Sequence, residues 1–241
     1  IPVLVTAQAD RRIDVNTGAA GSPAVAGNRV ALLIGNAAYQ NVPPLSNPLN
    51  DVRAFAQVLR DVGFDVIVRE NCDLRTLDEA VQDFWNRLKG KEAGLFYYSG
   101  HGMQVNGENY LVPVSALIEK EMDIKYNCYQ AQKILDYMDD AKAQTNIVIL
   151  DACRNNPFKR STRSAAMGLA RMDAVGQMFV AYATDPDKVA NDGDPGGNSP
   201  YMRHILKNIK TPGLPVEMLF KEVRAGVLDE TTTRPALRQE A

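Results

Sequence analysis

A histidine and a cysteine stand at equivalent points after two apolar segments of this sequence. His101 follows the run Gly94–Tyr98, and Cys153 follows the run Asn146–Leu150. Both runs have the length and composition of strands buried in a parallel sheet, and the carboxyl ends of such strands meet at one edge. A free thiol is mostly protonated at neutral pH, and a neighbouring imidazole can accept its proton. The pair therefore predicts a cysteine nucleophile with a histidine base.

The neighbours of this pair carry further chemical expectations. Gly100 and Gly102 flank His101 and leave space for a substrate backbone to come close. Asp151 lies two positions before Cys153, so on a regular strand both side chains face the same way. A carboxylate beside the nucleophile favours a cationic side chain, and an arginine can bind it with two parallel hydrogen bonds.

Alternating strands and helices are expected to position these residues. Additional strands are predicted at Val30–Ile34, Phe64–Val68 and Gln177–Ala183. Asn106-Gly107 between alternating residues predicts a hairpin within Met103–Pro113. This alternation of strands and helices predicts an α/β sandwich with a mostly parallel central sheet.

Helices are predicted where apolar residues recur at helical spacing. Asn47 before Pro48 is a suitable cap for the first helix, which Gly63 ends, and Asp73 is suitable for the second. The later helices are expected at Tyr129–Met138, Pro200–Ile209 and Pro215–Leu228.

The composition is that of a globular domain with one substantial core: 241 residues, 45% hydrophobic and 23% charged. Residues 1–28 are expected to form an arm or linker, and residues 29–241 the folded domain. A net charge of −2 offers no basic field for nucleic acid or an anionic membrane. No stretch reaches the about 18 apolar residues that span a bilayer.

The three cysteines cannot form a disulfide framework, because one must stay unpaired. This count favours a reducing compartment, and we expect a cytoplasmic protein. The alternative is a periplasmic protein, if Ile1–Ala9 is the remnant of a secretion signal.

An ordered set of segments resembles the caspase-like superfamily of cysteine peptidases. Tyr98-Ser-Gly-His-Gly102 and Leu150-Asp-Ala-Cys-Arg-Asn155 are similar to its two signature segments, and a spacing of 52 residues from histidine to cysteine is similar to that of caspases. The similarity looks greatest to the bacterial metacaspase or orthocaspase branch and spans about residues 29 to 233. Further support comes from Arg29–Asn36, Leu49–Val52, Gly107–Pro113 and Ala183–Pro200.

This resemblance implies a three-layer α/β/α sandwich with a large-subunit-like part at about 29–158 and a small-subunit-like part at about 176–241. It implies that Cys153 attacks the scissile carbonyl and that His101 carries the proton to the leaving amine. The backbone N–H groups of Gly102 and Cys153 would hold the oxyanion. A monomer and a homodimer both occur among the relatives.

The resemblance also implies a substrate preference. Metacaspase-like relatives use acidic residues equivalent by motif to Asp51 and Asp151, with Ser99 between them, and all three are present here. We therefore expect protein or peptide substrates cut after Arg or Lys, not after Asp. Self-cleavage in the following basic loop is expected at Lys159 or Arg160. Identical intact masses of the wild type and Cys153→Ala after incubation would contradict such self-processing.

No cofactor or metal ion is expected. Calcium-dependent relatives bind the ion through aspartates soon after the nucleophile, whereas Asn155–Arg163 holds no acidic residue. Cys72 and Cys128 are expected to be structural, and His204 to be a packed or surface residue of a helix.

Simpler roles stay open for several candidate residues. Asp151 could instead cap a helix or pair with Arg154. Asp51 could serve only to favour the dipole of its helix, and Ser99 could be a simple turn residue. A catalytically silent scaffold that binds partners is the rival function. A nucleotide-binding module is disfavoured, because Gly35–Tyr39 lacks the pattern of a phosphate-binding loop.

Overall fold

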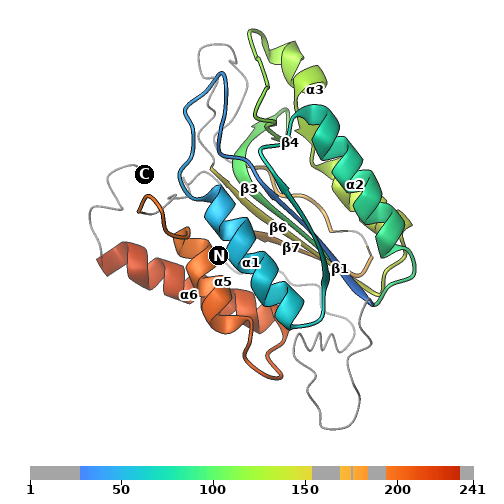
Figure 1. The fold of residues 1–241 in the computed structure, drawn as a ribbon, viewed down its shortest axis with the longest axis vertical. Helices are drawn as coiled ribbons and strands as arrows, with labels where there is room; N and C mark the ends of the chain where they lie inside the picture. The colour runs from blue at the N-terminus through green and yellow to red at the C-terminus, as the bar shows by residue number, and fades with distance from the viewer. Residues whose placement is uncertain (1–27, 154–168, 175, 184–193, 234–241) are drawn as a thin grey trace.

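The centre of the fold is a parallel sheet with the strand order β2-β1-β3-β6-β7 (Figure 1). The computed structural model describes residues 28–153, 169–174, 176–183 and 194–233. The parallel strands are β1 (Arg29–Gly35), β2 (Asp65–Glu70), β3 (Ala93–Val105), β6 (Thr145–Cys153) and β7 (Met178–Tyr182). Two short strands, β4 (Glu108–Leu111) and β5 (Tyr129–Gln130), extend the end of β3 in antiparallel pairing.

Helices cover both faces of the sheet. One face carries α1 (Pro48–Asp61), α5 (Pro200–Asn208) and α6 (Val216–Thr233), and the other carries α2 (Leu74–Leu88) and α4 (Gln132–Asp140). This arrangement confirms the predicted three-layer α/β/α sandwich. A short 3₁₀ turn, η1 (Glu121–Asp123), and α3 (Ile124–Asn127) follow β4.

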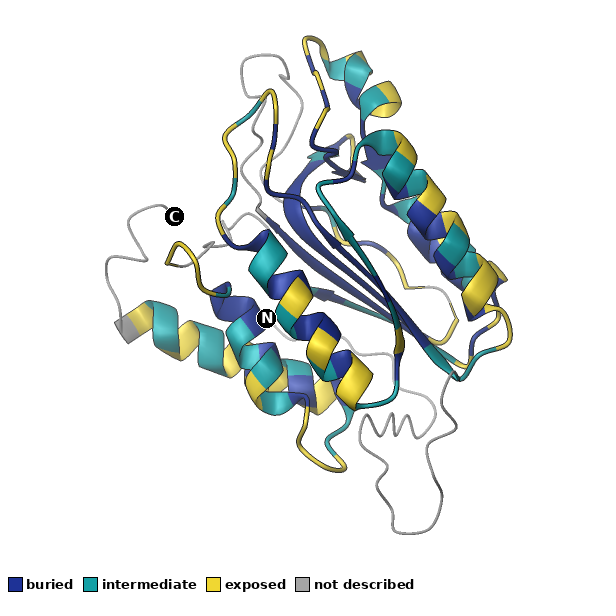
Figure 2. Ribbon diagram, viewed as in Figure 1, coloured by how far each residue is buried: buried dark blue, intermediate teal, exposed yellow. Residues whose placement is uncertain are grey.

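Side chains of the central strands alternate between two cores. Tyr97 of β3 packs in the core beneath α1, α5 and α6, whereas Phe96 and Tyr98 pack beneath α2 and α4. The central strands β1, β3 and β6 are buried on both faces, whereas the edge strands β2 and β7 are only partly buried (Figure 2). Each fully buried large apolar side chain contributes about 1.5–3 kcal/mol to folding. The two cores therefore fix β3 and β6, which carry the candidate catalytic residues.

The first two helices begin and end close to their predicted signals, whereas α6 continues past its predicted end at Leu228 to Thr233. Gly63, at φ 87°, follows the end of α1, and the Asp73 carboxylate caps α2 by accepting from the Thr76 N–H at 2.7 Å. Asn47 occupies the N-cap position of α1, but its side chain makes no capping hydrogen bond there. The predicted N-cap position is therefore confirmed, but the side chain of Asn47 binds the backbone of Asp194 and Gly196 instead of the helix.

Two strands are longer than predicted, because they pair beyond their apolar runs. β3 continues from Tyr98 to Val105, where it pairs with β4, and β6 continues to Cys153. The candidate residues thus lie within strands and not after them. The predicted hairpin is confirmed, with positive φ angles at Asn106 and Gly107.

One predicted helix begins later than expected, and one helical segment was not predicted. Tyr129 and Gln130 form β5 because they pair with β4, and α4 begins only at Gln132. The segment Glu121–Asn127 has no periodic apolar pattern, and its short helices were missed.

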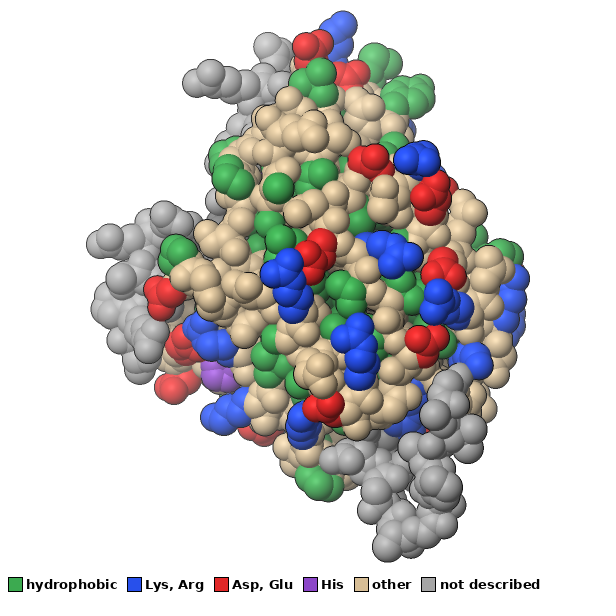
Figure 3. All heavy atoms as spheres, viewed as in Figure 1, with side chains coloured by type: hydrophobic (Ala, Val, Ile, Leu, Met, Phe, Trp, Pro, Cys, Tyr) green, Lys and Arg blue, Asp and Glu red, His purple; other side chains and the backbone are tan. Residues whose placement is uncertain are grey.

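Acidic and basic side chains intermix on the face seen in Figure 3. Arg53 pairs with Glu70 at 2.6 Å, and Arg87 pairs with Asp65 at 3.4 Å. This mixing matches the small net charge of −2. Among the described residues, no helix combines the length and apolar character needed to cross a bilayer.

Candidate active site

The backbones of His101 and Cys153 lie side by side. They are register partners in the parallel pair of β3 and β6, and Ser99 and Asp151 are partners two positions earlier. Neighbouring strands in a sheet lie about 4.8 Å apart. The sheet therefore brings together two residues that are far apart in the sequence, as their positions after apolar runs predicted.

The imidazole of His101 is held in one orientation. Its side chain is buried, with the residue 6% exposed, and its ring centroid lies 4.5 Å from that of Tyr39. Its Nε2 lies 2.9 Å from the carbonyl oxygen of Pro43. A carbonyl only accepts hydrogen bonds, so Nε2 carries a hydrogen and Nδ1 is the basic nitrogen of the neutral ring.

Close packing around His101 explains why both of its neighbours in the sequence are glycines. A Cβ atom at Gly100 would lie 2.6 Å from the Tyr39 hydroxyl and 2.7 Å from the Tyr98 hydroxyl. These hydroxyls fix the backbone of His101: Tyr39 accepts from its N–H at 2.7 Å, and Tyr98 donates to its carbonyl at 2.8 Å. A Cβ atom at Gly102 would lie 2.9 Å from Cβ of Ala152. The expectation that Gly100 leaves space for a substrate was wrong, because tyrosine hydroxyls occupy that space.

Two buried carboxylates meet through one serine. Asp51 is 1% exposed and Asp151 is 7% exposed. Oδ1 of Asp51 accepts from the N–H of Ser199 and from Nδ2 of Asn198, both at 2.9 Å. Oδ2 of Asp151 accepts from the Ser199 hydroxyl at 3.0 Å and from the Tyr97 hydroxyl at 3.2 Å. Ser199 thus joins both carboxylates in one buried acidic site, and we use the name acidic pocket for Asp51, Asp151 and Ser199.

The charges of the acidic pocket act on the surrounding tyrosines. Burial raises the pKa of Tyr97 well above its ordinary value, and the charges of Asp151 and Asp51 raise it further. Burial and the charge of Asp151 raise the pKa of Tyr201 in the same way. Both hydroxyls therefore stay protonated at neutral pH, which leaves Tyr97 able to donate to Asp151.

A family comparison places this arrangement among known proteins. The family model described as the caspase domain matches residues 28–240. The chain belongs to the caspase-like superfamily of cysteine peptidases. The three-layer fold agrees with this membership, and so does the pairing of β3, which carries His101, with β6, which carries Cys153.

Curated relatives of this caspase domain are much longer proteins. The chain is 35% identical over 130 residues to the human mucosa-associated lymphoid tissue lymphoma translocation protein 1, a match that covers 54% of this chain and 15% of that protein. It is 36% identical over 134 residues to the mouse homologue, which covers 56% of this chain and 16% of that protein. Both relatives are mammalian, and the expected closeness to bacterial metacaspases stays a prediction.

The simpler roles that the sequence left open for Ser99, Asp151 and Asp51 can be compared with their positions in the structure. Ser99 lies within β3 and is no turn residue. Asp151 lies within β6, and the N-cap of α5 beside it is Ser199, from whose hydroxyl Asp151 accepts. The alternative of a partner of Arg154 falls on a residue outside the described structure. Asp51 lies in the first turn of α1, yet its carboxylate binds the beginning of α5, so it does more than favour the dipole of its own helix.

The other expected residues lie apart from the acidic pocket or outside the described structure. Burial raises the pKa of Cys72 to about 11 and that of Cys128 to about 12, which suits structural thiols. His204 lies on α5, and its Nε2 is 3.1 Å from Oε2 of Glu230. Arg154 and the proposed self-cleavage residues lie outside the described residues, as does most of the N-terminal arm. The self-cleavage residues are Lys159 and Arg160.

Several residues of the site were missed in the sequence. Asn198 and Ser199 hold Asp51, Tyr97 holds Asp151, and Pro43 orients His101. The dipeptide Ser199-Pro200 carries the signature of a helix start, and this local signal identifies a cap but not a pocket residue. Pro43 contributes only a backbone carbonyl, for which the sequence holds no signal.

Proposed function

We propose that this caspase domain is a cysteine endopeptidase that cleaves peptide bonds after Arg or Lys. The observation that carries the specificity is the pair of buried carboxylates, Asp51 and Asp151, joined through Ser199. Asp151 lies two positions before Cys153 on β6, so the negative charge stands next to the proposed nucleophile. A cationic side chain before the scissile bond would find its counter-charge there, whereas an aspartate would be repelled.

The proposed reaction uses a thiol and an imidazole. Nδ1 of His101 takes the proton of the Cys153 thiol, and the sulfur attacks the scissile carbonyl. The protonated imidazole then gives that proton to the leaving amine, which leaves a thioester that water hydrolyses. The Nε2–H bond to the Pro43 carbonyl keeps Nδ1 the basic nitrogen of the neutral ring and holds the orientation of the ring when it is protonated.

The developing oxyanion requires donors that are already in place. The backbone N–H groups of Gly102 and Cys153 are proposed for this role, because backbone donors near the nucleophile need no reorganisation during the reaction. No step of this scheme needs an organic cofactor or calcium, because the thiol supplies the nucleophile and the imidazole the base.

A set of fluorogenic tetrapeptides that differ only in the residue before the scissile bond tests this proposal. We expect kcat/KM for Arg or Lys to exceed that for Asp by about 100-fold or more, since a desolvated charge pair contributes about 1.5–3 kcal/mol and the like charge adds repulsion. Equal turnover of Arg and Asp peptides would contradict the specificity. Absence of any turnover would instead favour a silent scaffold.

A further inference from the structure

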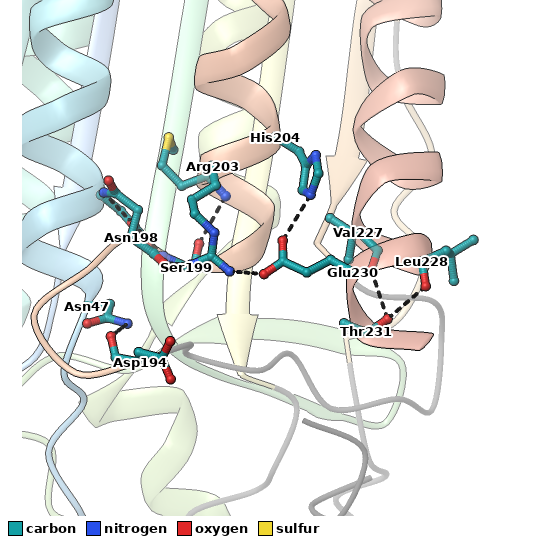
Figure 4. A network of polar contacts seen from close by, with 12 residues as sticks. Asn47, Asp194, Asn198, Ser199, Arg203, His204, Val227, Leu228, Glu230 and Thr231 are labelled. Carbon is teal, nitrogen blue, oxygen red and sulfur yellow. Dashed lines mark hydrogen bonds and ion pairs between the residues drawn. The ribbon is translucent and has the colours of Figure 1, made fainter. Parts of the chain in front are cut away.

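Asn198, which binds Asp51 of the acidic pocket, is connected to the last two helices by a continuous set of polar contacts (Figure 4). The guanidinium of Arg203, on α5, donates from NH1 to the backbone carbonyl of Asn198 at 2.6 Å. Its NH2 group forms an ion pair with Glu230 of α6. Glu230 also contacts Nε2 of His204 through its second oxygen. These contacts tie α6 to the residue that binds Asp51.

The segment that carries Asn198 is held from two sides. We call residues 194–199 the pocket loop. On one side, Asn47 donates to the Asp194 carbonyl at 3.0 Å and accepts from the Gly196 N–H at 3.2 Å. Asn50 of α1 donates to the Gly197 carbonyl at 3.0 Å. On the other side, the Asn198 carbonyl is bound by a side chain of α5.

Two consecutive residues of the pocket loop bind the carboxylates. Asn198 binds Asp51 with its side-chain amide, and Ser199 binds Asp51 with its N–H and Asp151 with its hydroxyl. The peptide group between these residues carries both the Asn198 carbonyl, which Arg203 binds, and the Ser199 N–H, which binds Asp51. A rotation of this peptide group would therefore displace the N–H donor of Asp51. Hydrogen bonds weaken steeply with distance and angle, so the orientation of the Asn198 carbonyl affects how well the Ser199 N–H binds Asp51.

We propose that Arg203, supported by Glu230, is a positioning residue that sets the specificity of the acidic pocket through the Asn198 carbonyl. This inference rests on the proposed function, since it assumes that the pocket receives Arg or Lys. The planar guanidinium binds two acceptors at once in a fixed geometry, and a lysine ammonium cannot reproduce that geometry. Arg203 and Glu230 are both half-buried, which strengthens their pairing relative to an exposed ion pair.

The protonation of Glu230 suits this supporting role. Burial alone would raise its pKa, but the hydrogen bond and charge of Arg203, followed by those of His204, lower it below its ordinary value. The carboxylate is therefore ionised at neutral pH and remains available to Arg203.

A binding measurement tests this role without any turnover. The probe is an acetylated tripeptide that ends in Arg, titrated calorimetrically into Cys153→Ala protein. We expect Arg203→Gln in this background to weaken binding about tenfold, Glu230→Gln to weaken it about threefold, and Arg203→Lys to fall between Arg203→Gln and the parent. Lys207→Gln and Glu222→Gln remove the same charges from exposed positions of the same two helices and should bind as the parent does.

Kinetics separate positioning from a general loss of structure. In active protein, Arg203→Gln should raise KM for an Arg peptide about tenfold and leave kcat within about twofold. The rate at which iodoacetamide alkylates Cys153 should stay unchanged, because this reagent does not use the pocket. If Arg203→Gln fails to fold, judged by its melting temperature, then Arg203→Lys and Glu230→Gln carry the test.

Each outcome decides the inference. Unchanged binding and KM in the folded Arg203 and Glu230 variants would overturn it, and so would equal losses in their two exposed controls. Absence of peptide binding to Cys153→Ala protein would overturn the pocket and this inference together. Binding that depends on Arg203, in a protein that cleaves no peptide, would refute only the proposed function.

Discussion

Replacing Cys153 by alanine is expected to lower kcat/KM for the best Arg peptide by about ten-thousand-fold or more. The change removes the proposed nucleophile, and a water molecule attacks the peptide carbonyl far more slowly than a thiolate does. His101→Ala should lower it by about a thousand-fold or more, since the thiol then has no positioned base. The measurement is steady-state turnover of the fluorogenic Arg peptide by each purified variant.

Cys72→Ala is the matched control for this prediction. Burial raises the pKa of the Cys72 thiol to about 11, so at pH 7.5 it is almost entirely protonated and unreactive. Burial raises the pKa of the Cys128 thiol to about 12, so this thiol should be unreactive for the same reason. Activity of Cys72→Ala should therefore stay within a few-fold of the wild type, and iodoacetamide at pH 7.5 should label Cys153 first. Residual activity above about one per cent in Cys153→Ala would contradict its role as nucleophile.

The second large effect is expected from neutralising the acidic pocket. Asp151→Asn keeps the size of the side chain and an oxygen acceptor for Ser199 and Tyr97, but removes the charge. We expect kcat/KM for Arg peptides to fall by about 100-fold, in keeping with about 2–3 kcal/mol for a buried charge-assisted pair. Asp51→Asn should act in the same direction, because Ser199 joins both carboxylates.

A neutral isostere of arginine makes this second prediction specific. Citrulline has nearly the shape of arginine without its charge, so the ratio of kcat/KM for Arg and citrulline peptides reports the charge interaction alone. This ratio should fall strongly in Asp151→Asn, and further when Asp51→Asn is added. Asp136→Asn, an exposed change on α4, should leave it unaltered. The same large ratio in wild type and Asp151→Asn would show that the charge of Asp151 does not select the substrate.

Much of the fold follows from local patterns. Unbroken apolar runs identified β1, β3 and β6, and helical spacing identified the helices that cover them, because burial on one or both faces leaves a direct trace in the sequence. The meeting of His101 and Cys153 was also predictable. Parallel strands place residues that follow equivalent apolar runs at the same edge, and the register of β3 and β6 brings these two together.

The sequence by itself thus determined the order of the main strands and helices, the family and the candidate nucleophile and base. Tertiary structure alone decided how the carboxylates are held. Ser199 lies 148 positions from Asp51 and 48 from Asp151, and Asn47 binds the pocket loop although its local sequence indicates a helix cap. Such contacts depend on how α1, α5 and β6 pack together. Neither spacing nor hydrophobic pattern records that packing, because each describes only the neighbourhood of a residue along the chain.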